Sequence, residues 1–190
     1  MSAAVQPRLI IVSAPSGAGK TTLCEKLIKD FPSIRLSIST TTRERRHYET
    51  EGVHYHFVDK SIFESKIAQQ EFAEWARVHG NLYGTSKKVI EGFLADGKHV
   101  LFDIDVQGAV NLKKLYPDRA LMIFIHPPSL QILEERLRGR KSESGTSLET
   151  RLQNAYNELA WSQKFDYQIT NDNLERAYAQ LTSIIRRECA

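Results

Sequence analysis

Residues 9–21 are Leu9-Ile10-Ile11-Val12-Ser13-Ala14-Pro15-Ser16-Gly17-Ala18-Gly19-Lys20-Thr21, an apolar run that leads into a glycine-rich loop. Such a run is typical of a buried parallel strand, and Thr22–Asp30 continues with a helical pattern. A loop of the form G-x-x-x-x-G-K-[ST] between a strand and a helix is a phosphate-binding loop. We therefore predict that Ala14–Thr21, with Thr22, binds the phosphates of a nucleoside triphosphate.

The residue types of this loop suit that chemistry. Gly17 and Gly19 allow backbone N–H groups to close around phosphate oxygens. Lys20 can reach the β- and γ-phosphates, and the Thr21 hydroxyl can ligate Mg²⁺. Ala14 replaces the first glycine of the pattern, but alanine is small and excludes only a strongly positive φ. The alternative is a chance glycine turn between a strand and a helix, which Gly-Lys-Thr makes the weaker interpretation.

The composition is that of an ordinary globular chain. Its 190 residues can bury one good core but not two large domains. The 26 basic and 23 acidic residues give a formal charge of +3, too small an excess to argue for nucleic acid.

Several features bear on where the protein works. The two cysteines, Cys24 and Cys189, do not make a disulfide framework and favour a reducing compartment. Met1–Arg8 lacks the features of a signal peptide, and the longest apolar run, Ala120–Ile125, is too short to span a membrane. We expect a cytoplasmic protein without a membrane partner, and a homo-oligomer stays open.

Further apolar runs alternate with helical patterns. His99–Asp105 precedes a helix at Gln107–Tyr116, and Leu121–Ile125 precedes a helix for which Ser129 is a suitable N-cap. A shorter strand at Tyr167–Thr170 precedes a last helix near Leu174–Glu188. This alternation predicts an α/β fold, a three-layer sandwich around a mainly parallel sheet.

Two stretches differ in amino-acid composition from the rest of the chain. Residues 37–85 are rich in Ser, Thr, Tyr, His and Arg with short alternating pieces such as His54–Val58, which predicts a small antiparallel sheet with one helix. The polar stretch that begins at Gly139 is a candidate lid. We expect one domain with a core of about 8–36 and 86–190, an inserted subdomain of about 37–85 and a lid of about 139–150.

Asp103 and Asp105 alternate at the carboxyl end of a predicted buried strand. Ligands of open α/β sheets bind at that edge, and a carboxylate there can hold the Mg²⁺ of a nucleotide in the neighbouring loop. The alternative is that the two aspartates cap the next helix. We favour function, because two carboxylates that end a buried strand are costly without a cation.

A series of motifs extends from Ser39 to Asp172. They are Ser39-Thr40-Thr41-Thr42-Arg43, Arg46, Glu49-Thr50-Glu51-Gly52, Tyr55-His56-Phe57, Glu71–Ala76, Gly80–Thr85, Asp103–Gly108, Pro127-Pro128-Ser129, Arg136–Arg140, Arg151 and Thr170-Asn171-Asp172. In these motifs and their order, over nearly the whole chain, the sequence resembles bacterial-type guanylate kinases, which belong to the P-loop group of nucleoside-monophosphate kinases.

The resemblance implies transfer of the γ-phosphoryl group of ATP to GMP, and to dGMP, in purine nucleotide metabolism. Arg43 and Arg46, at an interval of three, can form a fork for one phosphate, and Tyr55 and Tyr83 could add phenolic donors. Taken alone, this stretch would be a solvated basic turn. In the family, these four positions bind the phosphate of the nucleoside monophosphate.

Glu74 is expected to select the base. Guanine presents N1–H and an exocyclic amine side by side, and one carboxylate can accept from both, whereas adenine offers no such pair. The family uses this position in that way, with hydroxyl groups at Ser39 and Thr85. The alternative is an exposed strand carboxylate.

The resemblance also implies the remaining roles. Asp105 contacts the nucleoside monophosphate, Asp103 belongs to the Mg²⁺ surroundings with Thr21, and Asn171 lies at the ATP site. Lys20, Arg43, Arg140 and Arg151 stabilise charge during phosphoryl transfer. Arg136 and Arg138 could equally be solvated helix charges and are left out of the site.

One departure and two other functions are considered. Arg45 and Tyr48 replace a proline and a glycine that are common in the family, so the turn there is not predicted. A guanylate-kinase-like domain that only binds proteins would have an eroded phosphate loop, which this chain does not have. A kinase for a different monophosphate is the remaining alternative.

Overall fold

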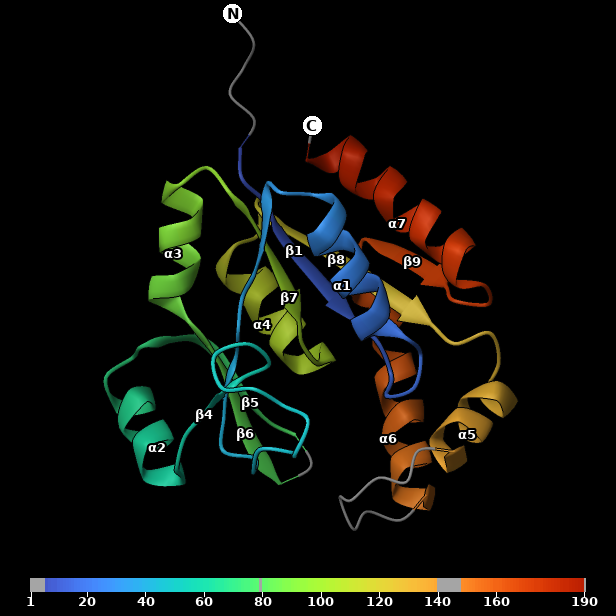
Figure 1. Cartoon of the computed structure of the whole chain (residues 1–190), viewed down its shortest axis with the longest axis horizontal. Coiled ribbons are helices and arrows are strands. Elements are labelled where there is room, and N and C mark those ends of the chain that lie inside the picture. Colours follow the sequence, from blue (N-terminus) through green and yellow to red (C-terminus); the bar gives the residue numbers. More distant parts are fainter. Residues whose placement is uncertain (1–5, 79, 140–147, 190) are drawn as a thin grey trace, which may run out of the picture.

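The structure, a computed structural model, describes residues 6–78, 80–139 and 148–189. Its central sheet has the strand order β2-β7-β1-β8-β9 (Figure 1). All neighbouring strands in it are parallel. The strands are β1 (Leu9–Ser13), β2 (Ile34–Leu36), β7 (His99–Asp103), β8 (Ala120–His126) and β9 (Tyr167–Thr170). The predicted mainly parallel α/β fold is confirmed.

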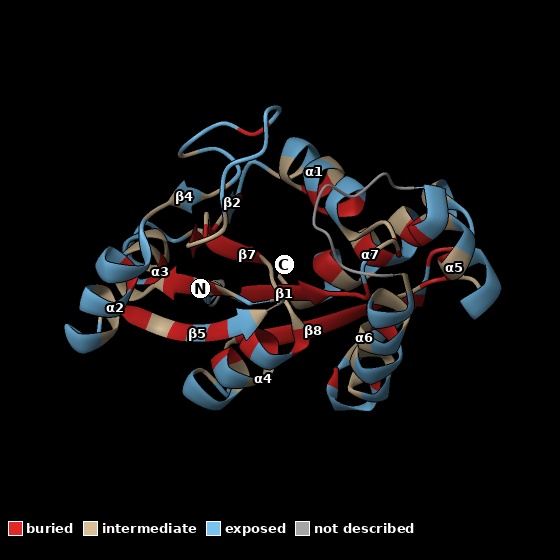
Figure 2. Ribbon diagram, turned by 90° about the horizontal axis from the view of Figure 1, so that it is seen from below, coloured by how far each residue is buried: buried red, intermediate tan, exposed pale blue. Residues whose placement is uncertain are grey.

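Alternating side chains of the strands build a core on each face of this sheet. Ile10 and Val12 of β1 pack on the face covered by α1 (Lys20–Asp30) and α7 (Leu174–Glu188). Leu9 and Ile11 pack on the opposite face, covered by α3 (Lys87–Ala95) and α4 (Val106–Leu115). Figure 2 shows the buried strands β1, β7 and β8 between these layers. The apolar runs in the sequence follow from burial on both faces.

A second sheet has the order β4-β3-β6-β5. Its strands are β3 (Thr40–Thr41), β4 (His56–Phe57), β5 (Phe72–Val78) and β6 (Asn81–Ser86), and α2 (Lys60–Ala68) packs Phe63 against Phe72 and Leu82. The sheet was expected to be antiparallel, but β3 and β4 pair in parallel. The connection between them, residues 42–55, has the length that a parallel return requires.

Two helices and a short turn complete the chain. α5 (Leu130–Gly139) and α6 (Leu148–Ala160) pack through Leu133, Leu137 and Ala155, and the 3₁₀ turn η1 (Ser162–Lys164) follows. The hydroxyl of Ser129 accepts a hydrogen bond from the backbone N–H of Ile132, so this N-cap is confirmed. No helix within the described ranges is long and apolar enough to cross a membrane.

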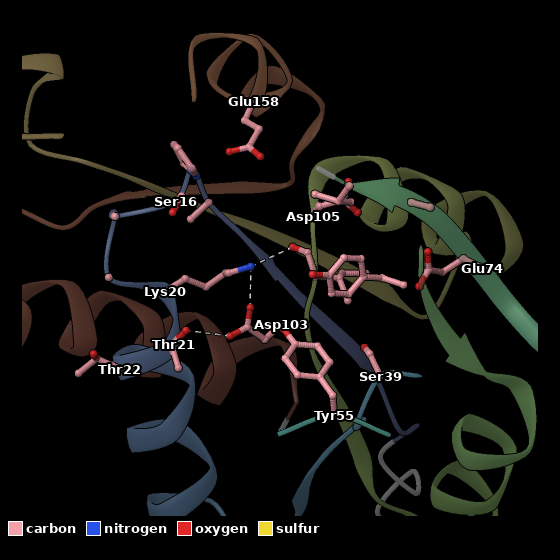
Figure 3. A pocket seen from close by; sticks show the side chains of 18 residues that line it. Ser16, Lys20, Thr21, Thr22, Ser39, Tyr55, Glu74, Asp103, Asp105 and Glu158 are labelled. Atoms are coloured by element: carbon pink, nitrogen blue, oxygen red, sulfur yellow. Dashed lines mark hydrogen bonds and ion pairs between the residues drawn. The ribbon is translucent and has the colours of Figure 1, made fainter. Parts of the chain in front are cut away.

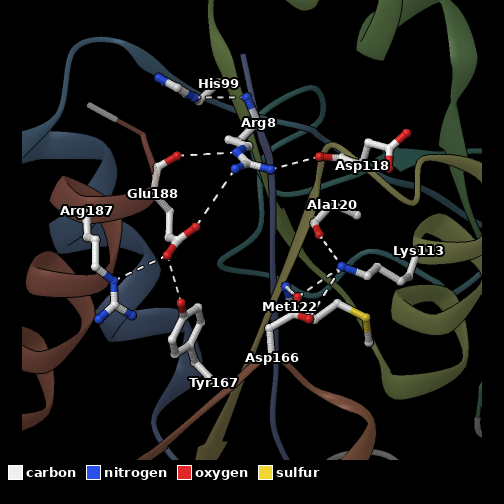
Figure 4. A network of polar contacts seen from close by, with 10 residues as sticks. All are labelled: Arg8, His99, Lys113, Asp118, Ala120, Met122, Asp166, Tyr167, Arg187 and Glu188. Carbon is white, nitrogen blue, oxygen red and sulfur yellow. Dashed lines mark hydrogen bonds and ion pairs between the residues drawn. The ribbon is translucent and has the colours of Figure 1, made fainter. Parts of the chain in front are cut away.

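Polar contacts tie the chain ends together at the amino edge of the sheet (Figure 4). The Arg8 guanidinium donates to the carbonyl oxygens of Asp118 and Glu188 at 2.8 and 3.3 Å. The Arg8 backbone N–H donates to Nδ1 of His99 at 3.0 Å. The Tyr167 hydroxyl donates to Oε1 of Glu188 at 2.7 Å, which anchors the end of α7. These contacts occupy the amino ends of the strands, so a ligand site is to be sought at the carboxyl ends.

Candidate active site

A pocket of about 300 Å³ lies at the carboxyl ends of β1 and β7, between the glycine-rich loop and the second sheet (Figure 3). It brings together most of the residues that the sequence nominated. These are Ala14, Pro15, Ser16, Gly17, Gly19, Lys20, Thr21, Thr22, Ser39, Tyr55, Glu74, Tyr83, Asp103 and Asp105. Residues from the central sheet and from the second sheet therefore face one cavity.

The glycine-rich loop has the backbone that its sequence requires. Gly17 and Gly19 have φ values of +93° and +90°, which L side chains rarely adopt. The loop is held from behind by Asn171, whose side-chain amide donates to the carbonyl oxygen of Ala18 at 2.8 Å. A Cβ at position 19 would collide with that amide nitrogen. Ala14 is buried and is not among the described residues with positive φ, as expected.

Lys20 is engaged with the neighbouring strand. Its Nζ lies 2.5 Å from Oδ1 of Asp103 and donates to the carbonyl oxygen of Ile104 at 3.1 Å. Burial lowers the pKa of Lys20, but the charge and hydrogen bond of Asp103 more than offset this, so the pKa is raised. The ammonium is therefore charged, and it must exchange these partners to reach a phosphate.

Thr21 and Asp103 fit a small hard cation. The Thr21 hydroxyl donates to Oδ2 of Asp103 at 3.3 Å, so two oxygen ligands converge beside the loop. Among the described residues no group of three or more His, Cys, Asp or Glu side chains could hold a metal ion by itself. An ion here would take its other ligands from nucleotide phosphates and water, which is how Mg²⁺ is commonly bound.

Asp105 has a capping position as well as a pocket position. β7 ends at Asp103 rather than at Asp105, and Oδ1 of Asp105 accepts from the backbone N–H of Gly108 at 3.0 Å. Asp105 is thus the N-cap of α4, as the alternative interpretation proposed for both aspartates. It also lines the pocket, so capping does not remove it from the site.

Glu74 is buried, with 7% of its surface exposed, so the exposed strand carboxylate was the wrong alternative. It pairs with Thr85 across β5 and β6, next to a bulge between Phe72 and Glu74. Thr85 donates its hydroxyl hydrogen to Oε1 of Glu74 at 2.6 Å. Burial raises the pKa of Glu74 to about 7, the Thr85 bond opposes the rise and the charge of Asp105 adds to it.

Tyr55 and Tyr83 line the pocket with their rings 5.8 Å apart. Burial raises the pKa of Tyr55, so the phenol stays protonated and can donate to an anion. The guanidinium carbon of Arg43 lies 5.4 Å from the centre of the Tyr55 ring. Arg43 is thus next to the pocket, although it is not among the described residues that line it.

Glu49 occupies the place where a phosphate fork would be expected. Nη2 of Arg43 donates to Oε1 of Glu49 at 2.6 Å, and the backbone N–H of Arg46 donates to Oε2 at 2.8 Å. Burial would raise the pKa of Glu49, but these bonds lower it. The Arg46 guanidinium donates to the Tyr48 hydroxyl at 3.1 Å, and its Nη1 also lies 4.0 Å from Oε1 of Glu49. Both guanidiniums are therefore near the same carboxylate oxygen, but neither arginine is among the described residues that line the pocket.

The arginines near the predicted lid have different positions. Arg140 lies outside the described residues, as does most of the lid at 139–150. Arg151 donates from Nη1 to the carbonyl oxygen of Leu137 at 3.0 Å, which links α6 to α5. Arg138 pairs with Glu134 on the surface.

Arg136, left out by the sequence reasoning, lies at the loop. Its Nη1 donates to the carbonyl oxygen of Gly17 at 3.3 Å. It lines a second pocket beside the loop, with Gly17, Gly19, Thr22, Asn171, Asp172 and Leu174.

Glu158 of α6 also faces the main pocket and was missed (Figure 3). Its carboxyl group is directed toward the glycine-rich loop. Burial raises its pKa to about 7; the Lys20 charge and the Ser16 backbone N–H lower it, and Asp105 raises it. Its spacing of seven residues from Arg151, two helical turns, is a signal that could have indicated a shared face.

Comparisons with known proteins agree with the motifs. A family model described as guanylate kinase matches residues 6–188. A guanylate kinase of Syntrophotalea carbinolica is 48% identical over 180 residues, which are 95% of this chain and 85% of that protein. A guanylate kinase of Chlorobium chlorochromatii is 45% identical over 184 residues, 96% of this chain and 97% of that protein.

Solved structures give the same result. The crystal structure of guanylate kinase from Anaplasma phagocytophilum matches with a TM-score of 0.83 at 31% identity, covering 98% of this chain and 88% of that one. The SH3-kinase fragment of tight junction protein 3 matches with a TM-score of 0.52 at 13% identity, covering 99% of this chain and 59% of that one. The latter likeness shows the fold alone.

Proposed function

The chain belongs to the guanylate kinase family and transfers the γ-phosphoryl group of ATP to GMP, giving ADP and GDP, and we propose how its residues divide this work. The observation that carries the proposal is the shared cavity. One pocket joins the glycine-rich loop, with Lys20 and Thr21, to Glu74 of the second sheet. Residues 37–85 would then be the subdomain that binds the acceptor, and the core of 8–36 and 86–190 the part that binds ATP.

Glu74 would recognise the guanine base. Oε1 already accepts from Thr85 at 2.6 Å, which fixes the orientation of the carboxylate and leaves its remaining lone pairs for N1–H and the exocyclic amine. Ser39, buried at the same pocket, would add a hydroxyl, and Asp105 a further acceptor. We assign these groups to the base and none of them to the ribose 2′-hydroxyl, so we extend the proposal to dGMP.

Tyr55, Tyr83, Arg43 and Arg46 would bind the phosphate of GMP. Arg43 is near the Tyr55 ring but paired with Glu49, and Arg46 lies 4.0 Å from the same Glu49 oxygen and donates to the Tyr48 hydroxyl. The proposal therefore includes a rearrangement in which both guanidiniums turn from these partners toward the phosphate. A doubly charged phosphate can compete for them, because charge-assisted bidentate bonds to arginine are strong.

The donor would lie on the glycine-rich loop. Ala14–Thr22 would bind the triphosphate through backbone N–H groups and the start of α1. Asn171 holds the loop from behind and lines the second pocket, which supports its assignment to the ATP site.

Lys20, Arg43, Arg140 and Arg151 would stabilise charge on the transferred group. ATP is used with a divalent metal, which we propose to be Mg²⁺ held by Thr21 and Asp103; when bound it would neutralise charge on the β- and γ-phosphates. Lys20 would leave Asp103 for the phosphates as the nucleotide arrives. No general base is needed, because a phosphate oxygen of GMP is already anionic. Closure of residues 37–85 and 139–150 would exclude water and prevent hydrolysis of ATP.

The cellular setting is proposed from the thiols and the charges. Cys24 and Cys189 are both free, which supports a reducing compartment such as the cytoplasm. Arg43 and Arg46 have protein partners, so their cluster does not argue for nucleic acid. Every proposed group comes from one chain, so the reaction would be the same in a monomer and in a homo-oligomer.

A coupled assay of ADP release with GMP, dGMP, AMP, CMP and UMP tests the proposal. We expect turnover with GMP and dGMP, and kcat/KM lower for AMP by a factor on the order of 10³ or more, because adenine leaves Glu74 without its donors. No turnover with any acceptor would favour a protein-interaction domain. A preference for another monophosphate would remove Glu74 from base selection.

A further inference from the structure

Gly108 lies in the first turn of α4 with a helical backbone that any residue could adopt. It is absent from the described glycines with positive φ, so its backbone conformation does not require glycine. Glycine inside a helix lowers stability relative to alanine. We therefore look for the reason for glycine at this buried position in the room that a side chain would need.

The space next to Gly108 is occupied by the carboxyl groups of the acceptor half of the pocket. A Cβ on residue 108 would lie 2.8 Å from Oε2 and 3.2 Å from Cδ of Glu74, and 3.1 Å from Oδ1 of Asp105. The first of these is shorter than real Cβ contacts. Glu74 thus lies directly against the helix at the point where the helix has no side chain.

Glu74 has little freedom to avoid such a methyl group. Its other oxygen, Oε1, is bound to Thr85 at 2.6 Å, and the residue is buried between β6 and α4. A Cβ at position 108 would force the carboxylate to turn away from Thr85 or α4 to move from β5. Either change alters the direction in which the carboxylate presents its lone pairs.

We propose that Gly108 is a positioning residue for guanine recognition, because its missing side chain lets the Glu74 carboxylate lie between Thr85 and α4 in a fixed orientation. This inference rests on the proposed role of Glu74 at the guanine base. Gly108 itself would not touch the nucleotide; it would act through Glu74, and its effect should appear with the acceptor and not with ATP.

Gly108→Ala tests the inference, with Gly92→Ala as the matched control. Gly92 lies inside α3, and a Cβ there would meet nothing within 4 Å, so both variants gain the same helix propensity but only one meets a neighbour. We expect Gly108→Ala to lower kcat/KM for GMP at least tenfold with KM for ATP within twofold of wild type. Gly92→Ala should leave both unchanged. An unchanged kcat/KM for GMP in Gly108→Ala would overturn the inference.

The same substitution in a Glu74→Ala background separates positioning from general damage. Without the Glu74 carboxylate, only Oδ1 of Asp105 at 3.1 Å remains of the three nearest atoms, so Gly108→Ala should then lower kcat/KM for GMP far less than the tenfold expected with Glu74 present. A loss of the same size in both backgrounds would show that Gly108 does not act through Glu74 and would overturn the inference. If Gly108→Ala alone does not fold, the double variant should fold; failure of both to fold would also overturn it.

Glu74→Ala alone distinguishes a failure of the proposed role of Glu74 from a failure of the proposed role of Gly108. If it leaves the preference for GMP over AMP intact, the proposed role of Glu74 fails, whatever Gly108 does. If it removes that preference while Gly108→Ala behaves as wild type, only the role of Gly108 fails.

Discussion

Thr85 donates its hydroxyl hydrogen to Oε1 of Glu74 at 2.6 Å, and neither residue has more than a small fraction of its surface exposed. A buried carboxylate with one neutral donor is only partly satisfied, which is why its pKa rises to about 7. A ligand that offers two more N–H donors at this point would complete its hydrogen bonding. Protonation of Glu74 and recognition of the guanine ring therefore involve the same carboxyl group.

Glu74→Gln should weaken the preference for GMP. The amide presents one acceptor and one donor, so one guanine donor would face an N–H group, whereas N1 of adenine would gain a donor. We expect the ratio of kcat/KM for GMP to that for AMP to fall by about 10²-fold or more. Steady-state kinetics with both acceptors measures it, and an unchanged ratio would remove Glu74 from the base pocket.

KM for GMP should depend on pH near neutrality. Because burial raises the pKa of Glu74 to about 7, the residue is mostly protonated below that pH and must lose its proton to accept from guanine. KM for GMP should therefore rise as pH falls below 7, approaching about tenfold per unit, and level off above pH 8.

Glu74→Gln is the control for this pH dependence. The phosphate of GMP titrates near pH 6 and affects both proteins alike. The ratio of KM for GMP in wild type to KM for GMP in the variant therefore reports the protonation of Glu74 alone, and this ratio should rise as pH falls. Parallel curves for the two proteins would contradict the prediction.

Much of the fold follows from local patterns. Tyr167–Thr170 and Leu174–Glu188 were predicted with the bounds that the structure has, since Tyr, Ile and Thr favour a strand and a long amphipathic helix is a strong signal. β2 (Ile34–Leu36) and α3 (Lys87–Ala95) were not predicted. β2 has three residues and one sheet neighbour, so it carries little pattern of its own.

Site residues whose positions depend on packing between distant segments of the chain could not be predicted from the sequence. Lys20 and Thr21 follow from the loop motif, because their positions are set by the local backbone. Glu158 resembles an ordinary solvated helix carboxylate in the sequence, and only the packing of α6 turns it into the pocket. The partners of Arg43 and Arg46 were also not predicted, because Glu49 is brought to them by the turn at residues 47–48, where its backbone N–H donates to the carbonyl oxygen of Arg46.

Lys20→Met should remove most turnover. Methionine has a similar length without the charge, so the transferred phosphoryl group loses a stabilising cation, and we expect kcat to fall about 10²–10³-fold. Circular dichroism serves as the folding control. A near-normal kcat would contradict the catalytic role and leave Lys20 as the ion-pair partner of Asp103.

Arg151→Ala should lower kcat more than nucleotide affinity. Nη1 of Arg151 donates to the carbonyl oxygen of Leu137, so we expect its contribution to the reaction to involve a change of partner. A residue that acts in the transition state affects kcat, by at least ~10²-fold here, with KM for ATP and GMP nearly constant. If instead KM rises and kcat is retained, Arg151 is a binding residue.

Glu158→Gln should strengthen ATP binding. The carboxyl group faces the glycine-rich loop beside Lys20 and Ser16, where the phosphates of ATP would add negative charge. With the pKa raised to about 7, Glu158 is ionised at pH 8 and protonated at pH 6. The glutamine variant should therefore lower KM for ATP about three- to tenfold at pH 8, and the difference should vanish toward pH 6. Glu91→Gln, which removes an exposed charge from α3 at a residue that lines neither pocket, is the control and should change neither value. A higher KM for ATP in Glu158→Gln would mean that the carboxylate supports the loop, because its removal would then weaken the phosphate site.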